Sequence, residues 1–345
     1  MTPDPARGLV QSCFMGGVGI SVNRPHPRHA VMVVVLVLVA AMATACFDPL
    51  NRPGSRDSDP NHISVGSGGV LEAQIIGQIY IDALEANGFV VTDQLNSGTR
   101  ERYIPALRAG DIDLVPDFAG NLLQYLAANT PTISAQRAEQ LSSVTSLPDI
   151  TKAFPEVLGD DLAVLTPAPG SDADSVTVTS ETAKRYGLKS IADLAELSKR
   201  QTVSFMANSE FATRSVGVPG LEKNYGLRVD FKPNNDSGGQ ATINELTSGR
   251  VTAADIYTTT PAIKTENLVV LEDPKNNFPA NNIVPLIAKS KATPKVSKVI
   301  DAVSSKLTVE ELRDLNYAVS GPRKLEVEQA ASEWVAKENL DRSFA

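Results

Sequence analysis

Histidine and cysteine are scarce in this chain of 345 residues. Two of the three histidines, His26 and His29, lie in an N-terminal stretch that we expect to be removed, which leaves His62. A Ser-His-Asp or Cys-His enzyme, a multi-histidine metal centre or an H-E-x-x-H zinc site is hard to build from one histidine. No G-x-S-x-G or P-loop motif stands between a strand and a helix. We therefore expect no catalytic residue, no metal and no cofactor.

The chain also has fewer basic than acidic residues. Lysine and arginine number 32 against 40 aspartates and glutamates, a net charge of −8. Proteins that hold nucleic acid neutralise phosphates with a basic surface, so the composition excludes nucleic acid as an expected partner. The 42% of hydrophobic and 21% of charged residues are those of an ordinary globular protein. The length indicates about two domains.

The N-terminus has the pattern of an export signal. Residues 30–45 are apolar except for Thr44 and follow a basic stretch, and the run is shorter than the roughly 20 residues of a spanning helix. It ends on Ala43-Thr44-Ala45-Cys46, which resembles the lipobox of bacterial lipoproteins. That resemblance implies cleavage before Cys46 and lipid on its thiol. An ordinary cleaved signal or a retained single-span anchor are the alternatives.

The mature chain has no disulfide available to it. Cys13 and Cys46 are the only cysteines, and Cys13 would leave with a signal peptide of residues 1–45. Residues 46–61 are polar and rich in turn formers, which is typical of a flexible tether. Stability must then come from the size of the core.

Strand and helix patterns alternate along the body of the chain. The first unit is a strand at 62–66, a glycine turn and a helix from Leu71, and the alternation continues to a strand at 253–256. Ser190 and Asp193 form a capping box at the start of a helix. We expect mostly parallel sheets covered by helices on both faces. The Pro-rich stretches at 167–172 and 272–282 are predicted to be two crossings between two lobes. The strand at 283–288 and the three C-terminal helices are then predicted to return to the first lobe.

A few polar features could carry function. The turn Gly66-Ser67-Gly68-Gly69 precedes a helix N-terminus, where free amides attract an anion such as a carboxylate, although a plain tight turn is equally consistent. Arg214 follows a strand end and could clamp a carboxylate, or could pair with Glu210 at helical spacing. We expect the acidic pairs Asp111/Asp113 and Asp160/Asp161 to be solvated loop residues.

The order of motifs from Ile63 to Val335 resembles the substrate-binding proteins of osmoprotectant ABC transporters, the glycine betaine/carnitine/choline family. The motifs in order are Val65-Gly66-Ser67, Asn96-Ser97-Gly98, Tyr103-Ile104-Pro105-Ala106-Leu107, Asp111-Ile112-Asp113-Leu114-Val115-Pro116-Asp117-Phe118-Ala119-Gly120, Ser209-Glu210-Phe211-Ala212-Thr213-Arg214, Asp255-Ile256-Tyr257-Thr258-Thr259, Leu271-Glu272-Asp273, Phe278-Pro279 and Leu315-Asn316-Tyr317.

The resemblance implies an α/β fold, the two-lobed type II periplasmic-binding-protein clamshell with two interlobe crossings. We expect residues 62–168 and 282–345 to form lobe I and residues 169–281 to form lobe II. The implied function is a lipid-anchored protein on the extracytoplasmic face of the bacterial membrane that delivers a small osmolyte to an ABC permease and its ATPase. The implied protein is not an enzyme.

The resemblance also implies a ligand site. A quaternary ammonium would lie in a box of aromatic faces by cation–π attraction, with Phe118 and Tyr257 as box residues and Arg214 on the ligand carboxylate. The expected ligand-binding residues are Ser67, Gly68, Phe118, Asn121, Glu210, Arg214, Tyr257, Thr258 and Asn281.

The chain departs from the family pattern at two box positions. Ser175 stands where the family has a tyrosine, and Pro279-Ala280-Asn281-Asn282 replaces P-P-Y-D. Gly68 stands at the position of a cleft lysine. Two aromatic walls would then be missing, which keeps open the same fold with a different small ligand and, more remotely, a hydrolase on an α/β scaffold. Trp334 is expected in the core.

Overall fold

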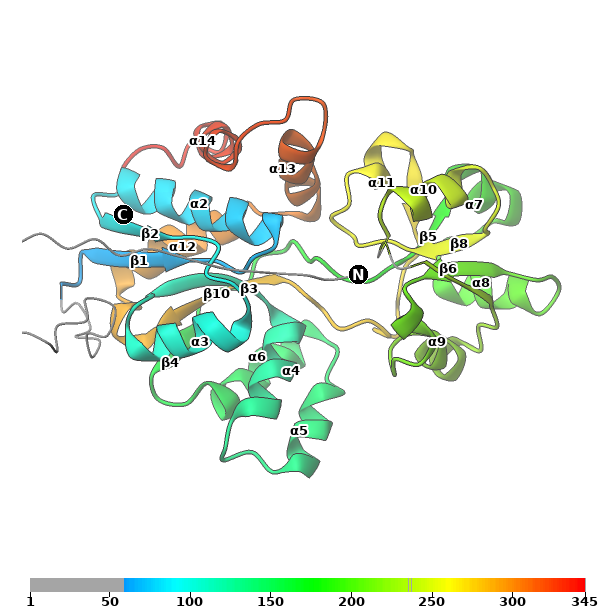
Figure 1. Cartoon of the computed structure of the whole chain (residues 1–345), viewed down its shortest axis with the longest axis horizontal. Coiled ribbons are helices and arrows are strands. Elements are labelled where there is room, and N and C mark those ends of the chain that lie inside the picture. The colour runs from blue at the N-terminus through cyan, green and yellow to red at the C-terminus, as the bar shows by residue number, and fades with distance from the viewer. Residues whose placement is uncertain (1–58, 235, 237, 345) are drawn as a thin grey trace, which may run out of the picture. The chain divides into compact units, whose positions relative to one another are not determined.

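The computed structural model describes residues 59–234, 236 and 238–344, and the expected signal peptide, Cys46 and most of the tether lie outside these residues. Two five-stranded sheets organise the described chain (Figure 1). We call each sheet, with the helices packed on it, a lobe.

The first sheet has the strand order β2-β1-β3-β10-β4. Its strands are β1 (His62–Gly66), β2 (Val90–Gln94), β3 (Leu114–Phe118), β4 (Leu162–Val164) and β10 (Ile283–Ala288). Its helices are α2 (Leu71–Ala86), α3 (Arg100–Ala109), α4 (Ala119–Asn129), α5 (Ala135–Ser142), α6 (Leu147–Leu158), α12 (Pro294–Ser304), α13 (Val309–Ser320) and α14 (Val327–Lys337), with a 3-10 turn η2 (Lys289–Lys291).

The second sheet has the order β7-β6-β8-β5-β9. Its strands are β5 (Val176–Thr179), β6 (Ser204–Ala207), β7 (Asp230–Pro233), β8 (Ala253–Asp255) and β9 (Leu268–Val270). Its helices are α7 (Ser180–Tyr186), α8 (Ile191–Ser198), α9 (Val218–Tyr225), α10 (Gln240–Thr247) and α11 (Ala262–Thr265), with a 3-10 turn η1 (Ser209–Ala212). The predicted capping box is present at the start of α8, where the side chains of Ser190 and Asp193 exchange bonds with the backbone.

The strand directions refine one expectation. The sheets are mixed: in each, four strands run in one direction and one runs against them, since β10 is antiparallel to β3 and β4, and β5 is antiparallel to β8 and β9. β10 and β5 are also the strands that directly follow the two expected crossings. A chain that enters a sheet from the neighbouring lobe comes from the opposite end, which reverses its direction relative to the local βαβ units.

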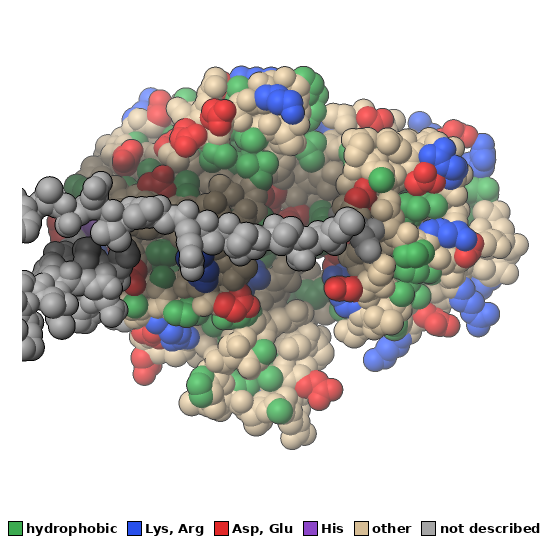
Figure 2. Space-filling view, in the orientation of Figure 1, with side chains coloured by type: hydrophobic (Ala, Val, Ile, Leu, Met, Phe, Trp, Pro, Cys, Tyr) green, Lys and Arg blue, Asp and Glu red, His purple; other side chains and the backbone are tan. Residues whose placement is uncertain are grey.

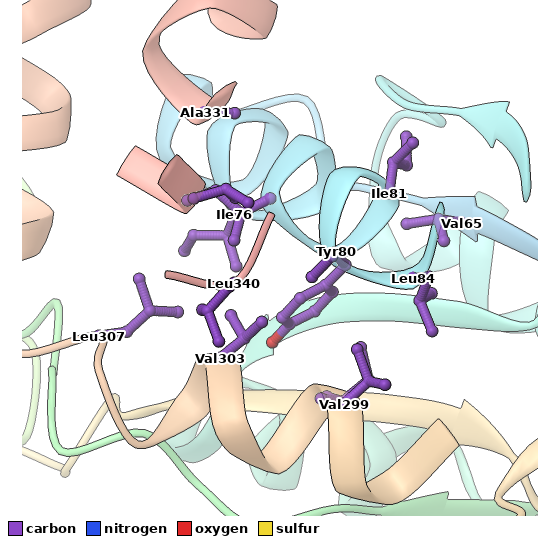
Figure 3. Packing of buried hydrophobic residues seen from close by; sticks show 14 of the residues in the cluster. Val65, Ile76, Tyr80, Ile81, Leu84, Val299, Val303, Leu307, Ala331 and Leu340 are labelled. Atoms are coloured by element: carbon purple, nitrogen blue, oxygen red, sulfur yellow. The ribbon is translucent and has the colours of Figure 1, made fainter. Parts of the chain in front are cut away.

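Alternation along the strands builds the core of the first lobe. On β10, Ile283 and Ile287 pack on one face of the sheet, while Val284 and Leu286 pack on the other. The first face is covered by α2, α12 and α14, and Figure 3 shows Tyr80 of α2 inserted beside Val299 and Val303 of α12. The second face is covered by α3, α4 and α6. A sheet buried on both faces gives a rigid support for residues at the strand ends.

Burial corrects a second expectation. Asp113 is not a solvated loop residue: it is 5% exposed, and its Oδ2 accepts a bond of 2.9 Å from the backbone N–H of Ser64. The Nζ of buried Lys291 lies 3.8 Å from the same oxygen. Asp160 is exposed, and the carboxylate of Asp161 accepts a bond from Arg108. Trp334 lies in the core, as predicted.

The two crossing segments lie side by side between the sheets. Ser171 and Asn282 form an antiparallel bridge, the N–H of Asp172 donates to the carbonyl of Asn281 at 3.0 Å, and the N–H of Ile283 donates to the carbonyl of Gly170 at 3.1 Å. This pairing sets which residues of the two crossings reach the cavity between the sheets.

On the face shown in Figure 2, lysine and arginine side chains of the described residues are interspersed with aspartate and glutamate side chains. In the part of the chain that the structure describes, no helix combines the length and the apolar character needed to cross a membrane.

Candidate ligand-binding site

Elements of both lobes line one cavity of about 1040 Å³. The first lobe contributes the glycine turn after β1, the first turns of α2 and α3, the end of β3 and residues of α4 and α13. The second lobe contributes Arg214 and the loop after β8, and the crossings contribute Asp172, Asp174 and Asn281. The volume is that of a small-molecule site.

Six of the nine predicted site residues line this cavity. They are Gly68, Phe118, Asn121, Arg214, Tyr257 and Asn281. The side-chain oxygen of Asn281 accepts a bond of 3.0 Å from the backbone N–H of Asn121, which joins the second crossing to the first turn of α4. The structure thus brings together residues that are far apart in sequence.

The other three predicted residues do not line the cavity. Ser67 is fully buried behind the glycine turn, where its Oγ donates to the carbonyl of Gly68 at 3.0 Å and accepts the N–H of Asn96 at 2.9 Å. Glu210 is exposed on η1. The Oγ1 of Thr258 donates to the carbonyl of Ser171 at 2.6 Å and ties the loop after β8 to the first crossing. Ser67 and Thr258 support the cavity wall from behind.

Arg214 pairs with a carboxylate of the protein itself. Its Nη2 lies 2.7 Å from Oδ2 of Asp174, and its guanidinium carbon lies 5.2 Å from the centre of the Phe211 ring. The partner is therefore Asp174 on the first crossing, not the Glu210 suggested by helical spacing. Nothing in the local sequence around Arg214 points to a residue 40 positions earlier.

Arg100 is paired in the same way. Its Nη2 lies 2.5 Å from Oδ1 of Asp117, whose other oxygen accepts the Tyr103 hydroxyl at 2.7 Å. Asp117 is 1% exposed and also accepts the backbone N–H of Phe118 at 2.7 Å. A buried carboxylate with this many donors holds the end of β3, and with it the Phe118 ring, in a defined position.

Glu72, in the first turn of α2, is a buried carboxyl group at the cavity wall. Its Oε2 accepts the side-chain N–H of Asn316 at 2.6 Å, while its Oε1 has no hydrogen-bond partner. Burial, and then the nearby charge of Asp172, raises the pKa of Glu72 to about 8. Burial also raises the pKa of Asp172. The glycine turn itself is less open to an anion than predicted, because the N–H of Gly69 donates to the carbonyl of Gly98.

The base of the second-lobe wall is acidic too. Asp255 at the end of β8 is 1% exposed, and burial, followed by the charge of Asp174, raises its pKa well above the ordinary value. Burial, together with Asp174 and Asp255, raises the pKa of Tyr257 to about 12. The Tyr257 hydroxyl therefore stays neutral at physiological pH.

Four aromatic side chains line the cavity: Tyr103, Phe118, Tyr125 and Tyr257. Tyr125 on α4 and Tyr103 on α3 were not among the predicted site residues, although Tyr103 stands in one of the motifs. Ser175 is buried behind the wall, with its Oγ bonded to the carbonyl of Ile256. Tyr103 and Tyr125 thus add two aromatic residues to the lining, at positions other than the two at which the family pattern is broken. The helical position of Tyr125, seven residues after Phe118, was the signal that sequence reasoning could have used.

No group of three or more His, Cys, Asp or Glu side chains suited to hold a metal ion occurs among the residues described in the structure. The five acidic residues that line the cavity are Glu72, Glu101, Asp117, Asp172 and Asp174. Most of these carboxyl groups are paired with arginines or buried, and they line the same cavity as the aromatic side chains.

Residues 61–337 match a family model described as the OpuAC substrate binding domain of ABC-type glycine betaine transport systems. The glycine betaine-binding protein YehZ of Escherichia coli is 26% identical over 271 residues, which are 75% of this chain and 85% of that protein. The Helicobacter pylori protein EgtU, named as an ergothioneine transport permease and binding protein, is 27% identical over 274 residues, 79% of this chain and 46% of that protein. This chain therefore spans about half of EgtU.

Two solved structures share the fold. The structure of apo YehZ from Escherichia coli has a TM-score of 0.65 at 24% identity and covers 81% of this chain and 99% of that one. A structure described as a glycine betaine/carnitine/choline ABC transporter has a TM-score of 0.66 at 23% identity, with the same coverage. The expected two-lobed type II periplasmic-binding-protein fold is confirmed.

Proposed function

Because this chain belongs to the OpuAC family of substrate-binding domains of ABC-type glycine betaine transport systems, we propose that it binds a small quaternary ammonium osmolyte, glycine betaine or a related compound, and delivers it to an ABC permease. The observation that carries the proposal is a cavity lined by four aromatic side chains and by more acidic than basic residues. A trimethylammonium group has no hydrogen to donate, so aromatic faces and negative charge are what can hold it.

The proposed mechanism is differential binding. The cavity takes its walls from both lobes, so a ligand that touches both walls stabilises the form in which they are close. A ligand can shift the equilibrium only by the difference between its affinities for the two forms. The permease would then recognise the closed form.

The finer assignments are also part of the proposal. Residues 1–45 would be a signal peptide, with lipid on the thiol of Cys46 and residues 46–61 as a tether that holds the protein at the extracytoplasmic face of the membrane. Residues 62–168 and 282–345 would form lobe I, and 169–281 lobe II. In this reading Phe118 and Tyr257 contact the ammonium group, with Gly68, Asn121 and Asn281 as polar lining, and the protein catalyses no reaction.

Calorimetric titration of the full-length exported protein, purified in detergent, with glycine betaine, choline, carnitine and proline tests the ligand class. We expect heat from at least one of the trimethylammonium compounds. A protein that gives no heat with any of them, and binds another compact solute instead, would contradict the proposal while keeping the fold.

A pair of variants at Phe118 links the binding to the cavity. A cation–π contact contributes about 0.5–2 kcal/mol, so Phe118→Leu should weaken binding by about 2- to 30-fold. Phe118→Tyr keeps an aromatic face at the same place and should bind nearly as well as the parent protein. Equal affinities for the two variants would place the ammonium group elsewhere.

A further inference from the structure

Acidic side chains outnumber basic ones in the cavity wall. Five acidic side chains line the cavity, and the basic side chains among its described lining residues are Arg100 and Arg214. Glu101 adds its charge at an exposed position in the first turn of α3. A ligand that enters this cavity therefore meets more acidic than basic side chains.

Both arginines are already bound to carboxylates of the protein. Arg100 lies on Asp117 at 2.5 Å, and Arg214 lies on Asp174 at 2.7 Å. The side chains of Asp117 and Asp174 are 0% and 12% exposed, so neither pair is an ordinary surface contact. A ligand carboxylate that approached Arg214 would have to displace Asp174, and a displaced carboxylate in a largely buried position is costly.

Glu72 and Asp172 add two further carboxyl groups to the cavity wall. Glu72 is 8% exposed, its Oε1 lacks a hydrogen-bond partner, and the residue lines the cavity beside Asp172. To the extent that Glu72 and Asp172 are ionised, they attract a ligand cation and repel a ligand carboxylate.

We propose that the site selects ligands that carry a positive charge and no carboxylate, such as choline, over zwitterions such as glycine betaine, and that Asp174 sets this preference by occupying Arg214. The inference rests on the proposed function, because it assumes that the cavity is the ligand site. Asp174 acts as a specificity-determining residue: its carboxylate stands where the ligand's carboxylate would otherwise bind. Asp174 thereby takes the place on Arg214 that the sequence analysis assigned to the carboxylate of the ligand.

Choline and glycine betaine provide a matched pair of probes, since both carry a trimethylammonium group and they differ in hydroxyl against carboxylate. Titration of the full-length protein with each should give a dissociation constant for choline at least about tenfold below that for glycine betaine. Tighter binding of glycine betaine would overturn the inference and leave the proposed function standing. Binding of neither compound would overturn the inference, and it would overturn the proposed function as well if carnitine also gives no heat.

Asp174→Asn tests the assigned residue. The amide cannot neutralise Arg214, so the free guanidinium should attract a ligand carboxylate and repel choline. We expect the ratio of the two dissociation constants to shift toward glycine betaine by about tenfold or more. Glu139→Gln removes the same charge from an exposed position on α5 and should leave the ratio unchanged. An unchanged ratio in a folded Asp174→Asn protein would contradict the assignment.

Arg214→Gln keeps the inference testable if Asp174→Asn does not fold. If Asp174 holds Arg214, removal of the guanidinium leaves an uncompensated carboxylate in the wall, and choline should bind as tightly as before or more tightly. Circular dichroism checks that the variant is folded. If the parent protein prefers glycine betaine and Arg214→Gln no longer binds it, then Arg214 binds the ligand carboxylate. That result would overturn the inference.

Discussion

At the scale of single residues, the site is governed by carboxyl groups that burial keeps from ionising normally. Glu72 is the clearest case, because desolvation and the charge of Asp172 raise its pKa to about 8. The side chain of Asn316 donates to Glu72, and Thr259 lies next to it with its hydroxyl bonded to Asp172. A folded state that binds a proton more tightly than the unfolded chain loses stability as the pH rises.

The sign and range of this effect follow from the two pKa values. The stability that neutral Glu72 contributes is fully present below about pH 4.5 and is lost as the pH rises through about 8. Urea unfolding without ligand at pH 5 to 9 should show that Glu72→Gln gains stability relative to the parent protein as the pH rises, by on the order of a few kcal/mol. The raised pKa values of Asp172 and Asp255 leave a residual slope in both proteins. Parallel stability profiles for the two proteins would refute this account of Glu72.

At the scale of elements, α13 is the helix of the first lobe that reaches the second. Its N-terminus is defined by Thr308, whose Oγ1 accepts the N–H of Glu311. Further along, the Nε of Arg313 donates to the carbonyl of Thr258 at 2.6 Å, and Asn316 donates to both Glu72 and the carbonyl of Thr259. One helix therefore connects the loop after β8 to the first turn of α2.

This connection predicts an effect on binding that is separate from stability. A hydrogen bond from a charged donor is worth about 1.5–3 kcal/mol, so Arg313→Gln should weaken ligand binding by about tenfold with little change in the thermal midpoint of the free protein. The matched control is Arg323→Gln, which removes a pair with Glu333 inside the first lobe and should leave the affinity unchanged. Equal affinities for both variants, or a loss of stability as large as the loss of affinity, would count against α13 as a link between the lobes.

At the scale of the whole molecule, the paired crossings bring the two lobes to one site. The bridge between Ser171 and Asn282 presents Asp172, Asp174 and Asn281 to the same cavity. Two connections that lie side by side favour a hinge movement of the lobes about the crossings, which is the motion used by proteins that close around a ligand. Ligand recognition and movement are therefore coupled through the same short segments.

The proposed membrane attachment is a property of the whole protein and depends on Cys46. We expect the parent protein to fractionate with the membrane of the expressing bacterium and Cys46→Ser to appear in the soluble extracytoplasmic fraction. Cys13→Ser, which changes the other cysteine, should behave as the parent does, because Cys13 would be removed with the signal peptide. Membrane association that survives Cys46→Ser would favour the retained single-span anchor.

The sequence by itself determined the fold class and much of the element order. The strand, glycine turn and helix at residues 62–86, the helix begun by the capping box of Ser190 and Asp193, and the core position of Trp334 are confirmed. Local periodicity and capping chemistry depend on neighbours within a few residues, so they can be recognised from a single sequence. The order of motifs then identified the family.

Only the tertiary structure decided the directions of β5 and β10, the burial of Asp113 and the chemistry of the site. Arg214 meets Asp174 across 40 positions, and Tyr125 and Tyr257 line one cavity although different lobes carry them. Glu72 is an acidic residue in the first turn of α2, and only the fold makes it a proton-binding group. Charge and solvation at a side chain depend on every element packed around it, and that information is not contained in the local pattern of residues.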